Sequence, residues 1–85
     1  MCKTLIYCMP EYSEVAAKLK DNYIAHDHHK EVDIIFETEQ DDVAYARENQ
    51  YDEAIFIEDS NMVVIHDIKT GYTERCLLAD VYYKD

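Results

Sequence analysis

Residues 3–23 decide the fold, and they read KTLIYCMPEYSEVAAKLKDNY. The apolar run from Lys3 to Met9 predicts a strand. Pro10 suits the first turn of a helix, where a missing N–H breaks no hydrogen bond. Beyond it, apolar side chains recur at i, i+3, i+4, i+7 and i+11, the spacing of one helical face: Tyr12, Val15, Ala16, Leu19 and Tyr23. We therefore predict a strand followed at once by an amphipathic helix, the first part of a β-α-β unit.

The rest of the chain extends this pattern. Strands are predicted over residues 31–37 and 53–58, and between them a helix over 39–49, for which Thr38 and Asp41 resemble an N-cap box. Polar turns then separate strands over 62–68 and 72–77, and residues 78–83 fit either a strand or a helix. The predicted order is β-α-β-α-β-β-β, an α/β fold (α+β mixed) in one domain spanning residues 1–85. Its mixed sheet carries two helices, with the first three strands parallel and the last strands in hairpins.

The charge of the chain excludes several functions. Nineteen acidic residues face eight basic ones, which gives a net charge of −11. Such a surface repels nucleic-acid phosphates and anionic membranes. No apolar run approaches the roughly 20 residues that a membrane span needs. Gly71 is the only glycine, so glycine-rich phosphate loops and the G-x-S-x-G motif are also absent.

The three cysteines favour a reducing compartment. An odd number leaves at least one free thiol. Cys2 and Cys8 belong to one predicted strand, whose extended length of roughly 20 Å is too great for a disulfide. The N-terminus lacks the apolar stretch of a signal peptide. We therefore expect a cytoplasmic protein.

Residues 37–59 form an acidic belt. This segment holds nine acidic residues, and Arg47 is its only base. Two tyrosines inside it could anchor an interface, because tyrosine combines apolar area with a polar tip. The predicted partner-binding residues are Glu37, Glu39, Asp41, Asp42, Tyr45, Glu48, Tyr51, Asp52, Glu53, Glu58 and Asp59. The alternative is a solvated face that keeps the protein soluble.

In size and charge the whole chain resembles the small acidic inhibitors, many of them phage-encoded, that mimic nucleic acid or block host defence enzymes. The resemblance rests on composition and on no motif, so it assigns no residue roles. It implies a protein-binding inhibitor that docks on a basic, nucleic-acid-handling host enzyme, of the anti-restriction, anti-CRISPR or host-takeover type. Such a protein would act in the host cytoplasm, without catalysis, a cofactor or direct contact with nucleic acid.

A second hypothesis is a nuclease. Asp52, followed by a hairpin and then by Asp67-Ile68-Lys69-Thr70-Gly71, resembles the core of nucleases of the PD-(D/E)xK class. The resemblance implies that Asp52 and Asp67 hold Mg²⁺ and that Lys69 positions or activates the attacking water. The same five residues also suit a hairpin turn, in which Gly71 supplies a positive φ.

Two further groups of residues could carry chemistry. Cys8, ahead of Pro10 and a predicted helix start, resembles the active-site position of thioredoxin folds, where a helix N-terminus lowers the thiol pKa. The alternative is a buried strand cysteine. Residues 26–29 read His-Asp-His-His, which suits zinc or nickel or else a polar loop. His66 alternates with apolar neighbours and fits a core or strand-edge histidine.

The tyrosine content predicts self-association. Eight of the 85 residues are tyrosine, and Tyr72, Tyr82 and Tyr83 lie near the C-terminus. Tyrosine is enriched in the cores of interfaces. We therefore expect a homodimer, formed through the C-terminal strand or through an open edge of the sheet.

Overall fold

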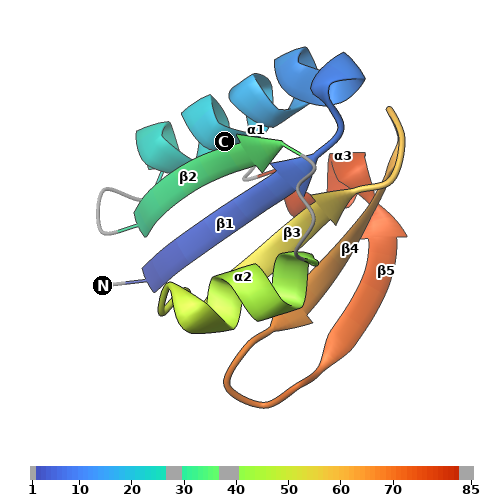
Figure 1. Ribbon diagram of the computed structural model, residues 1–85. Coiled ribbons are helices and arrows are strands. Elements are labelled where there is room, and N and C mark those ends of the chain that lie inside the picture. The colour runs from blue at the N-terminus through green and yellow to red at the C-terminus, as the bar shows by residue number, and fades with distance from the viewer. Residues whose placement is uncertain (1, 27–29, 37–40, 83–85) are drawn as a thin grey trace.

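A computed structural model describes residues 2–26, 30–36 and 41–82, which form a five-stranded sheet with helices on both faces (Figure 1). The strands are β1 (Cys2–Cys8), β2 (Lys30–Phe36), β3 (Glu53–Ile57), β4 (Met62–Asp67) and β5 (Thr73–Leu77). The helices are the 3₁₀ turn η1 (Pro10–Tyr12), α1 (Ser13–His26), α2 (Asp42–Glu48) and the short α3 (Leu78–Val81). Within the described ranges, none of these helices has the length and apolar character needed to cross a membrane.

The predicted fold class is confirmed. The strand order is β2-β1-β3-β4-β5, and β1 pairs in parallel with both β2 and β3. The β3–β4 and β4–β5 pairs are antiparallel, as expected for hairpins. Residues 78–83, for which the sequence fitted either a strand or a helix, contain α3 in their first four positions.

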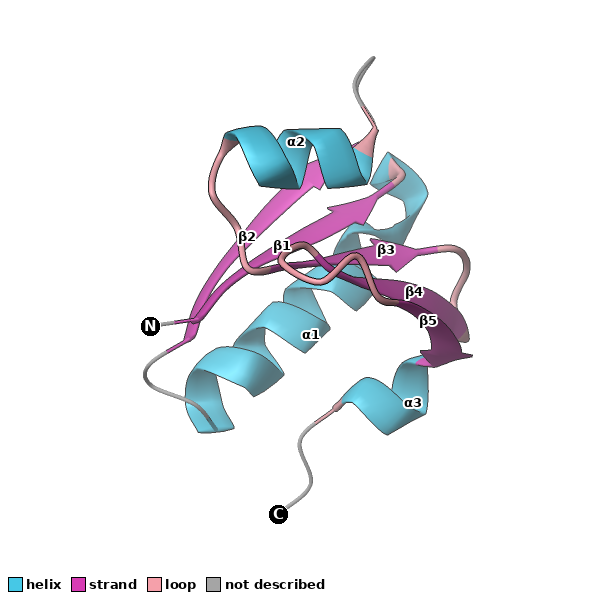
Figure 2. Cartoon of the chain, turned by 90° about the horizontal axis from the view of Figure 1, so that it is seen from below, coloured by secondary structure: helices cyan, strands magenta, loops and turns pink. Residues whose placement is uncertain are grey.

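The topology places α1 and α2 on opposite faces of the sheet. The chain passes from β1 to its neighbour β2 through α1, and then returns across β1 to β3 through α2. These two crossovers run in opposite directions, and parallel crossovers are almost always right-handed. The two helices must therefore lie on different faces. Figure 2 shows α2 on one side of the sheet and α1 with α3 on the other.

The larger core lies under α1 and α3. The helical face predicted from the sequence is the one that is buried, since Ala16, Leu19 and Tyr23 are buried and Tyr12 and Val15 pack against them. Alternate residues of β1 and β2, such as Ile6 and Val32, supply the sheet side of this core. Its further members, from β1, β3, β4 and the C-terminal segment, are Cys8, Ile55, Ile57, Val63 and Leu78.

The smaller core lies under α2. Leu5, Ala46, Tyr51 and Ala54 are buried there. The predicted N-cap box was wrong, because α2 begins at residue 42 and its N-cap is Asp41, whose carboxylate accepts a hydrogen bond from the Ala44 N–H at 2.9 Å. An aspartate is itself a strong N-cap, so it starts the helix three residues later than expected. Thr38 lies outside the described residues.

Candidate functional site

The structure divides the acidic belt between two ends of the sheet. Helix α2 runs from the carboxyl end of β2 back to the amino end of β3. Asp41, Glu58 and Asp59 therefore lie at the carboxyl end, where β1, β2 and β3 stop. Glu48, Asp52 and Glu53 lie at the amino end, roughly 17 Å away along a five-residue strand. The predicted residues Glu37 and Glu39, and the side chain of Asp42, are outside the described part.

Two of the three acids at the carboxyl end accept hydrogen bonds from backbone amides. The Asp59 carboxylate accepts hydrogen bonds from the N–H groups of Asn61 (2.7 Å) and Met62 (2.9 Å), and Asp41 accepts one from a helix amide. Amide donors stabilise a carboxylate without neutralising it. Glu58 differs, because its Oε2 lies 2.9 Å from Arg75 Nη2 and accepts a hydrogen bond from Arg75 Nε at 3.0 Å.

Apolar side chains accompany these acids. Met9, directly after β1, is 40% exposed, and Phe36, the last residue of β2, is 44% exposed. The carboxyl end of this sheet is also where the strand order reverses, with β2 on one side of β1 and β3 on the other. Open α/β sheets place their binding sites at such a point. Exposed apolar groups beside fixed negative charge make this end suited to contact with a basic protein.

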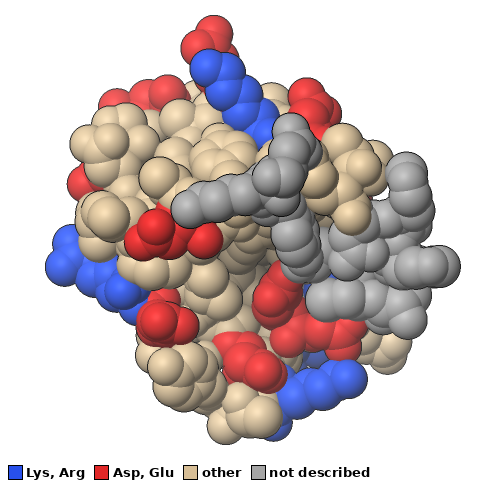
Figure 3. Space-filling view, turned by 180° about the vertical axis from the view of Figure 1, so that it is seen from behind, with Lys and Arg blue, Asp and Glu red and all other residues tan. Residues whose placement is uncertain are grey.

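Negative charge extends over the helical face as well. Figure 3 shows acidic side chains spread across the face seen from behind, with basic side chains at its margin. Glu14 and Asp21 of α1 and Asp80 of α3 belong to the exposed residues of these elements. Acidic side chains are therefore not confined to the carboxyl end of the sheet, and at that end they occur together with the exposed side chains of Met9 and Phe36.

At the amino end, Asp52 joins three segments. Its Oδ2 accepts the Lys3 N–H at 2.8 Å, and its Oδ1 lies 3.2 Å from Lys69 Nζ. The Lys3 amide and then Lys69 lower the pKa of this carboxyl below its ordinary value. Next to it, Glu53 accepts a hydrogen bond from the hydroxyl of the buried Thr4 at 2.6 Å. These contacts join β1, β3 and the turn after β4.

The two tyrosines of the belt lie against the sheet. Tyr51 is buried, its ring stacks on Tyr45 with 6.5 Å between centroids, and Lys3 Nζ lies 4.4 Å above it. Its hydroxyl donates to Asp33 Oδ2 at 2.7 Å, and burial followed by this hydrogen bond raises the pKa of Tyr51. Tyr51 is thus a core residue, and of the pair only the half-buried Tyr45 presents part of its ring to the surface.

The residues of the nuclease hypothesis make hydrogen bonds and an ion pair that stabilise the turn after β4. Asp67 Oδ1 accepts hydrogen bonds from the N–H groups of Lys69 (3.0 Å) and Thr70 (3.2 Å), and Gly71 takes the positive φ of 78° that the turn needs. Lys69 is paired with Asp52. Across residues 2–26, 30–36 and 41–82, no three His, Cys, Asp or Glu side chains are grouped to hold a metal ion. The geometry favours the hairpin interpretation of this motif.

The burial of Cys8 argues against the thiol hypothesis. Cys8 is fully buried at the end of β1, and burial raises the pKa of its thiol. The expected lowering of the thiol pKa by a helix N-terminus is therefore wrong, since desolvation of the thiolate is the stronger effect.

The described histidines make local contacts. His26 Nδ1 lies 2.9 Å from the Asn22 carbonyl oxygen, and His66 Nδ1 lies 3.0 Å from Thr73 Oγ1. Residues 27–29 are outside the described part.

Sequence reasoning missed the pairing partners of the acids and one pocket near the C-terminus. Lys3 and Asp52 are 49 positions apart, and no local pattern signals their contact. The pocket is formed by the turn after β3 and by residues 77–82. Its only sequence signal is the apolar spacing of Leu78 and Tyr82, which also fits a strand.

Comparison with known proteins gives a fold and no family. No protein-family model matches the chain, and no curated protein matches it in sequence. The fold is similar to part of the crystal structure of histidyl-tRNA synthetase from Nostoc sp. PCC 7120, with a TM-score of 0.73 and 16% sequence identity. The match covers 93% of this chain and 20% of the synthetase, so the chain spans about a fifth of that protein's length.

Proposed function

We propose that this chain is an acidic protein-binding inhibitor that docks on a basic, nucleic-acid-handling enzyme. The observation that carries the proposal is the carboxyl end of the sheet. Asp41 and Asp59 accept amide hydrogen bonds there, at the same end of the sheet as exposed Met9 and Phe36. Oriented charges steer a basic partner into contact, and the apolar groups add affinity once water is excluded.

Direct binding of nucleic acid is disfavoured. The net charge of −11 would repel a phosphate backbone at any approach. The similar structure is named as a histidyl-tRNA synthetase, a protein that acts with tRNA, but only a fifth of it is matched. We therefore carry over its fold and not its substrate. A rigid acidic domain of this kind fits a surface that ordinarily binds phosphates, which is the nucleic-acid mimicry expected from the composition.

The thiols support a cytoplasmic site of action. Cys8 and Cys76 are free, and Cys8 is enclosed in the larger core. Free thiols persist where the environment is reducing. The inhibitor would then meet its target enzyme in the cytoplasm, which would be the host cytoplasm for a viral protein.

The test is capture of partners from a cell lysate by the immobilised protein at about 50 mM and about 500 mM salt, with identification by mass spectrometry. Charge-steered contacts weaken as the Debye length shortens from about 14 Å to about 4 Å. A nucleic-acid enzyme retained at low salt and released at high salt supports the proposal. Retention of acidic proteins alone, or of the same proteins at both salt concentrations, contradicts it.

A further inference from the structure

Strand β5 leaves one edge of the described sheet open. It pairs with β4 on its inner side, where the Asp67 N–H donates to the Tyr72 carbonyl (2.7 Å) and the Leu78 N–H donates to the Asn61 carbonyl (2.7 Å). Backbone groups in an antiparallel pair alternate between facing the partner and facing away. Residues 72, 74, 76 and 78 thus face β4, whereas Thr73, Arg75 and Leu77 direct their N–H and C=O groups outward.

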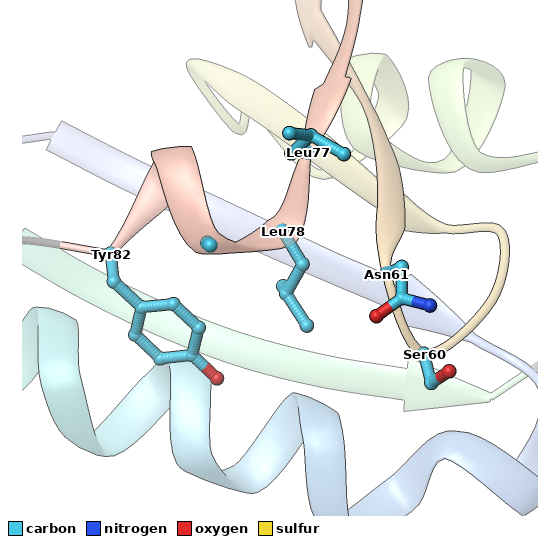
Figure 4. A pocket seen from close by; sticks show the side chains of 6 residues that line it. Ser60, Asn61, Leu77, Leu78 and Tyr82 are labelled. Carbon is cyan, nitrogen blue, oxygen red and sulfur yellow. The ribbon is translucent and has the colours of Figure 1, made fainter.

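An apolar pocket adjoins the end of this edge. Its volume is about 290 Å³, and the residues that line it are Ser60, Asn61, Leu77, Leu78, Ala79 and Tyr82. Figure 4 shows Tyr82 on one side, the turn residues Ser60 and Asn61 on the other, and Leu78 between them. Leu77 is 51% exposed although it is apolar. A chain that runs along β5 would leave the strand at Leu77, beside the pocket.

Negative charge surrounds the pocket and the edge. The two segments that form them, residues 58–62 and 73–82, hold four acidic residues, Glu58, Asp59, Glu74 and Asp80, and one base, Arg75. That base is already paired with Glu58. Burial, with added repulsion from Glu74 of β5 and Asp80 of the adjoining α3, raises the pKa of the Cys76 thiol.

We infer that β5 and the pocket together bind an extended, basic segment of a partner protein, which adds to the sheet as a sixth strand and inserts an apolar side chain beside Leu77. Strand addition gives affinity through main-chain hydrogen bonds and specificity through side-chain pockets. The surrounding carboxylates select for lysine and arginine in that segment. The inference rests on the proposed function and deepens it, because it names the binding mode of the basic partner.

A second copy of this chain is a poorer occupant. Two β5 strands paired around their middle residue would place Arg75 opposite Arg75, and pairing around Glu74 would place the two glutamates opposite each other. Like charges directly across a strand pair are destabilising. Each chain also carries a net charge of −11. Charge complementarity therefore favours a basic partner over the homodimer expected from the tyrosine content.

The probe is a fluorescein-labelled ten-residue peptide in which lysine alternates with valine and the last residue is leucine. One control peptide has glutamate in place of lysine, and another carries N-methyl groups on alternate backbone amides. Binding is measured by fluorescence anisotropy, and amide NMR shifts locate the contact. We expect the parent peptide to bind, shifting the amides of Thr73, Arg75 and Leu77, and both controls to bind at least about tenfold more weakly.

Two substitutions at one position isolate the edge. Arg75→Ala and Arg75→Pro both remove the ion pair with Glu58, but only proline removes the outward N–H. Because that N–H does not bond to β4, proline is tolerated there as on other edge strands. We expect Arg75→Ala to bind the peptide within about twofold of wild type and Arg75→Pro to bind at least about tenfold more weakly, with matching circular dichroism spectra.

The outcomes separate this inference from the proposed function. Equal peptide affinity for Arg75→Ala and Arg75→Pro, or NMR shifts confined to other elements, overturns strand addition, yet a salt-sensitive basic partner from lysate would still support the proposed function. Absence of binding by the parent peptide also overturns the inference. Leu77→Ser should lower the affinity for the peptide that ends in leucine and leave the affinity for a peptide that ends in serine unchanged. Equal losses of affinity for the two peptides would exclude the pocket as a contact site.

Discussion

Tyr51 shows how a residue of the acidic belt is held in the core. Its ring stacks on Tyr45 and lies below Lys3, and its hydroxyl donates a hydrogen bond to Asp33.

The substitution Tyr51→Phe keeps the ring contacts and removes only this hydrogen bond. We expect a loss of about 1 kcal/mol in the free energy of unfolding, measured by urea denaturation. Tyr72→Phe, at a tyrosine that is 62% exposed, is the control and should change stability by less than about 0.5 kcal/mol. Equal effects would contradict the role of Asp33.

Asp52 makes stability depend on pH. The Lys3 amide and Lys69 lower the pKa of its carboxyl in the folded state, so its contribution is present above the unfolded pKa of about 3.9 and is lost as the pH falls through the folded value. Asp52→Asn should therefore be less stable than wild type at pH 7, and the difference should close below about pH 4.

The matched variant for this prediction is Lys69→Ala. It removes one of the two contacts that lower the pKa of Asp52 and leaves the Lys3 N–H in place. The pH dependence should then shrink without vanishing. If the difference in free energy of unfolding between wild type and Asp52→Asn stays constant from pH 7 to pH 2, the charge of Asp52 contributes nothing to stability.

The partners of these side chains could not be predicted from the sequence. The belt was visible because nine acids fall within 23 residues, but the hydrogen bonds that join Asp52 to Lys3 and Glu53 to Thr4 each connect positions 49 residues apart. Composition gives the charge of a segment, whereas the distribution of that charge between two ends of the sheet depends on the direction of α2. Only the tertiary structure supplies that direction.

Among the elements, α2 is followed by a residue in a strained conformation, directly after its C-cap Asn49. Gln50 has φ of 62°, and behind it the Tyr51 N–H donates to the Ala46 carbonyl (2.9 Å) and the Gln50 N–H to Arg47 (3.3 Å). This is the Schellman pattern, which usually carries glycine at the left-handed position. The pattern turns the chain so that Tyr51 meets Ala46 in the smaller core.

Gln50→Gly should stabilise the protein. Glycine adopts a positive φ without the steric cost that a side chain imposes, and its greater freedom when unfolded offsets part of the gain. We expect the free energy of unfolding to rise by about 0.5–1 kcal/mol in urea denaturation. Asn49→Gly, one residue earlier at φ of −98°, should instead be destabilising. A loss of stability in Gln50→Gly would contradict the strain assigned to Gln50.

Elements with clear periodicity were predicted well, and the short helix predicted over residues 39–49 is present as α2 but begins three residues later. The apolar spacing from Tyr12 to Tyr23 located α1, and alternation located the strands. Helix α2 has seven residues and α3 has four, too few turns for a period to emerge. The predicted end of this helix at Asn49 agrees with the C-cap of α2, although glutamine stands at the next position, where glycine is usual.

At the scale of the whole molecule, a small mixed sheet carries a net charge of −11, and the exposed side chains of Met9 and Phe36 lie at the carboxyl end of its parallel strands. The fold is shared with part of a tRNA synthetase at 16% identity, so the surface rather than the fold distinguishes this chain. If partner binding depends on net charge alone, any acid removed should matter equally. If partner binding depends on the carboxyl end of the sheet, removing an acid there should lower the affinity more than removing an acid elsewhere.

The measurement that tests this most directly compares two double variants in affinity for the enzyme captured from lysate, by calorimetry at about 50 mM salt. Asp41→Asn with Asp59→Asn changes the carboxyl end, and asparagine retains an acceptor oxygen for the three amide contacts. Glu14→Gln with Asp21→Asn removes the same charge from α1. We predict that the first pair raises Kd at least about tenfold and the second by less than about threefold. Equal losses in the two variants, or none in the first, would contradict a docking site at the carboxyl end of the sheet.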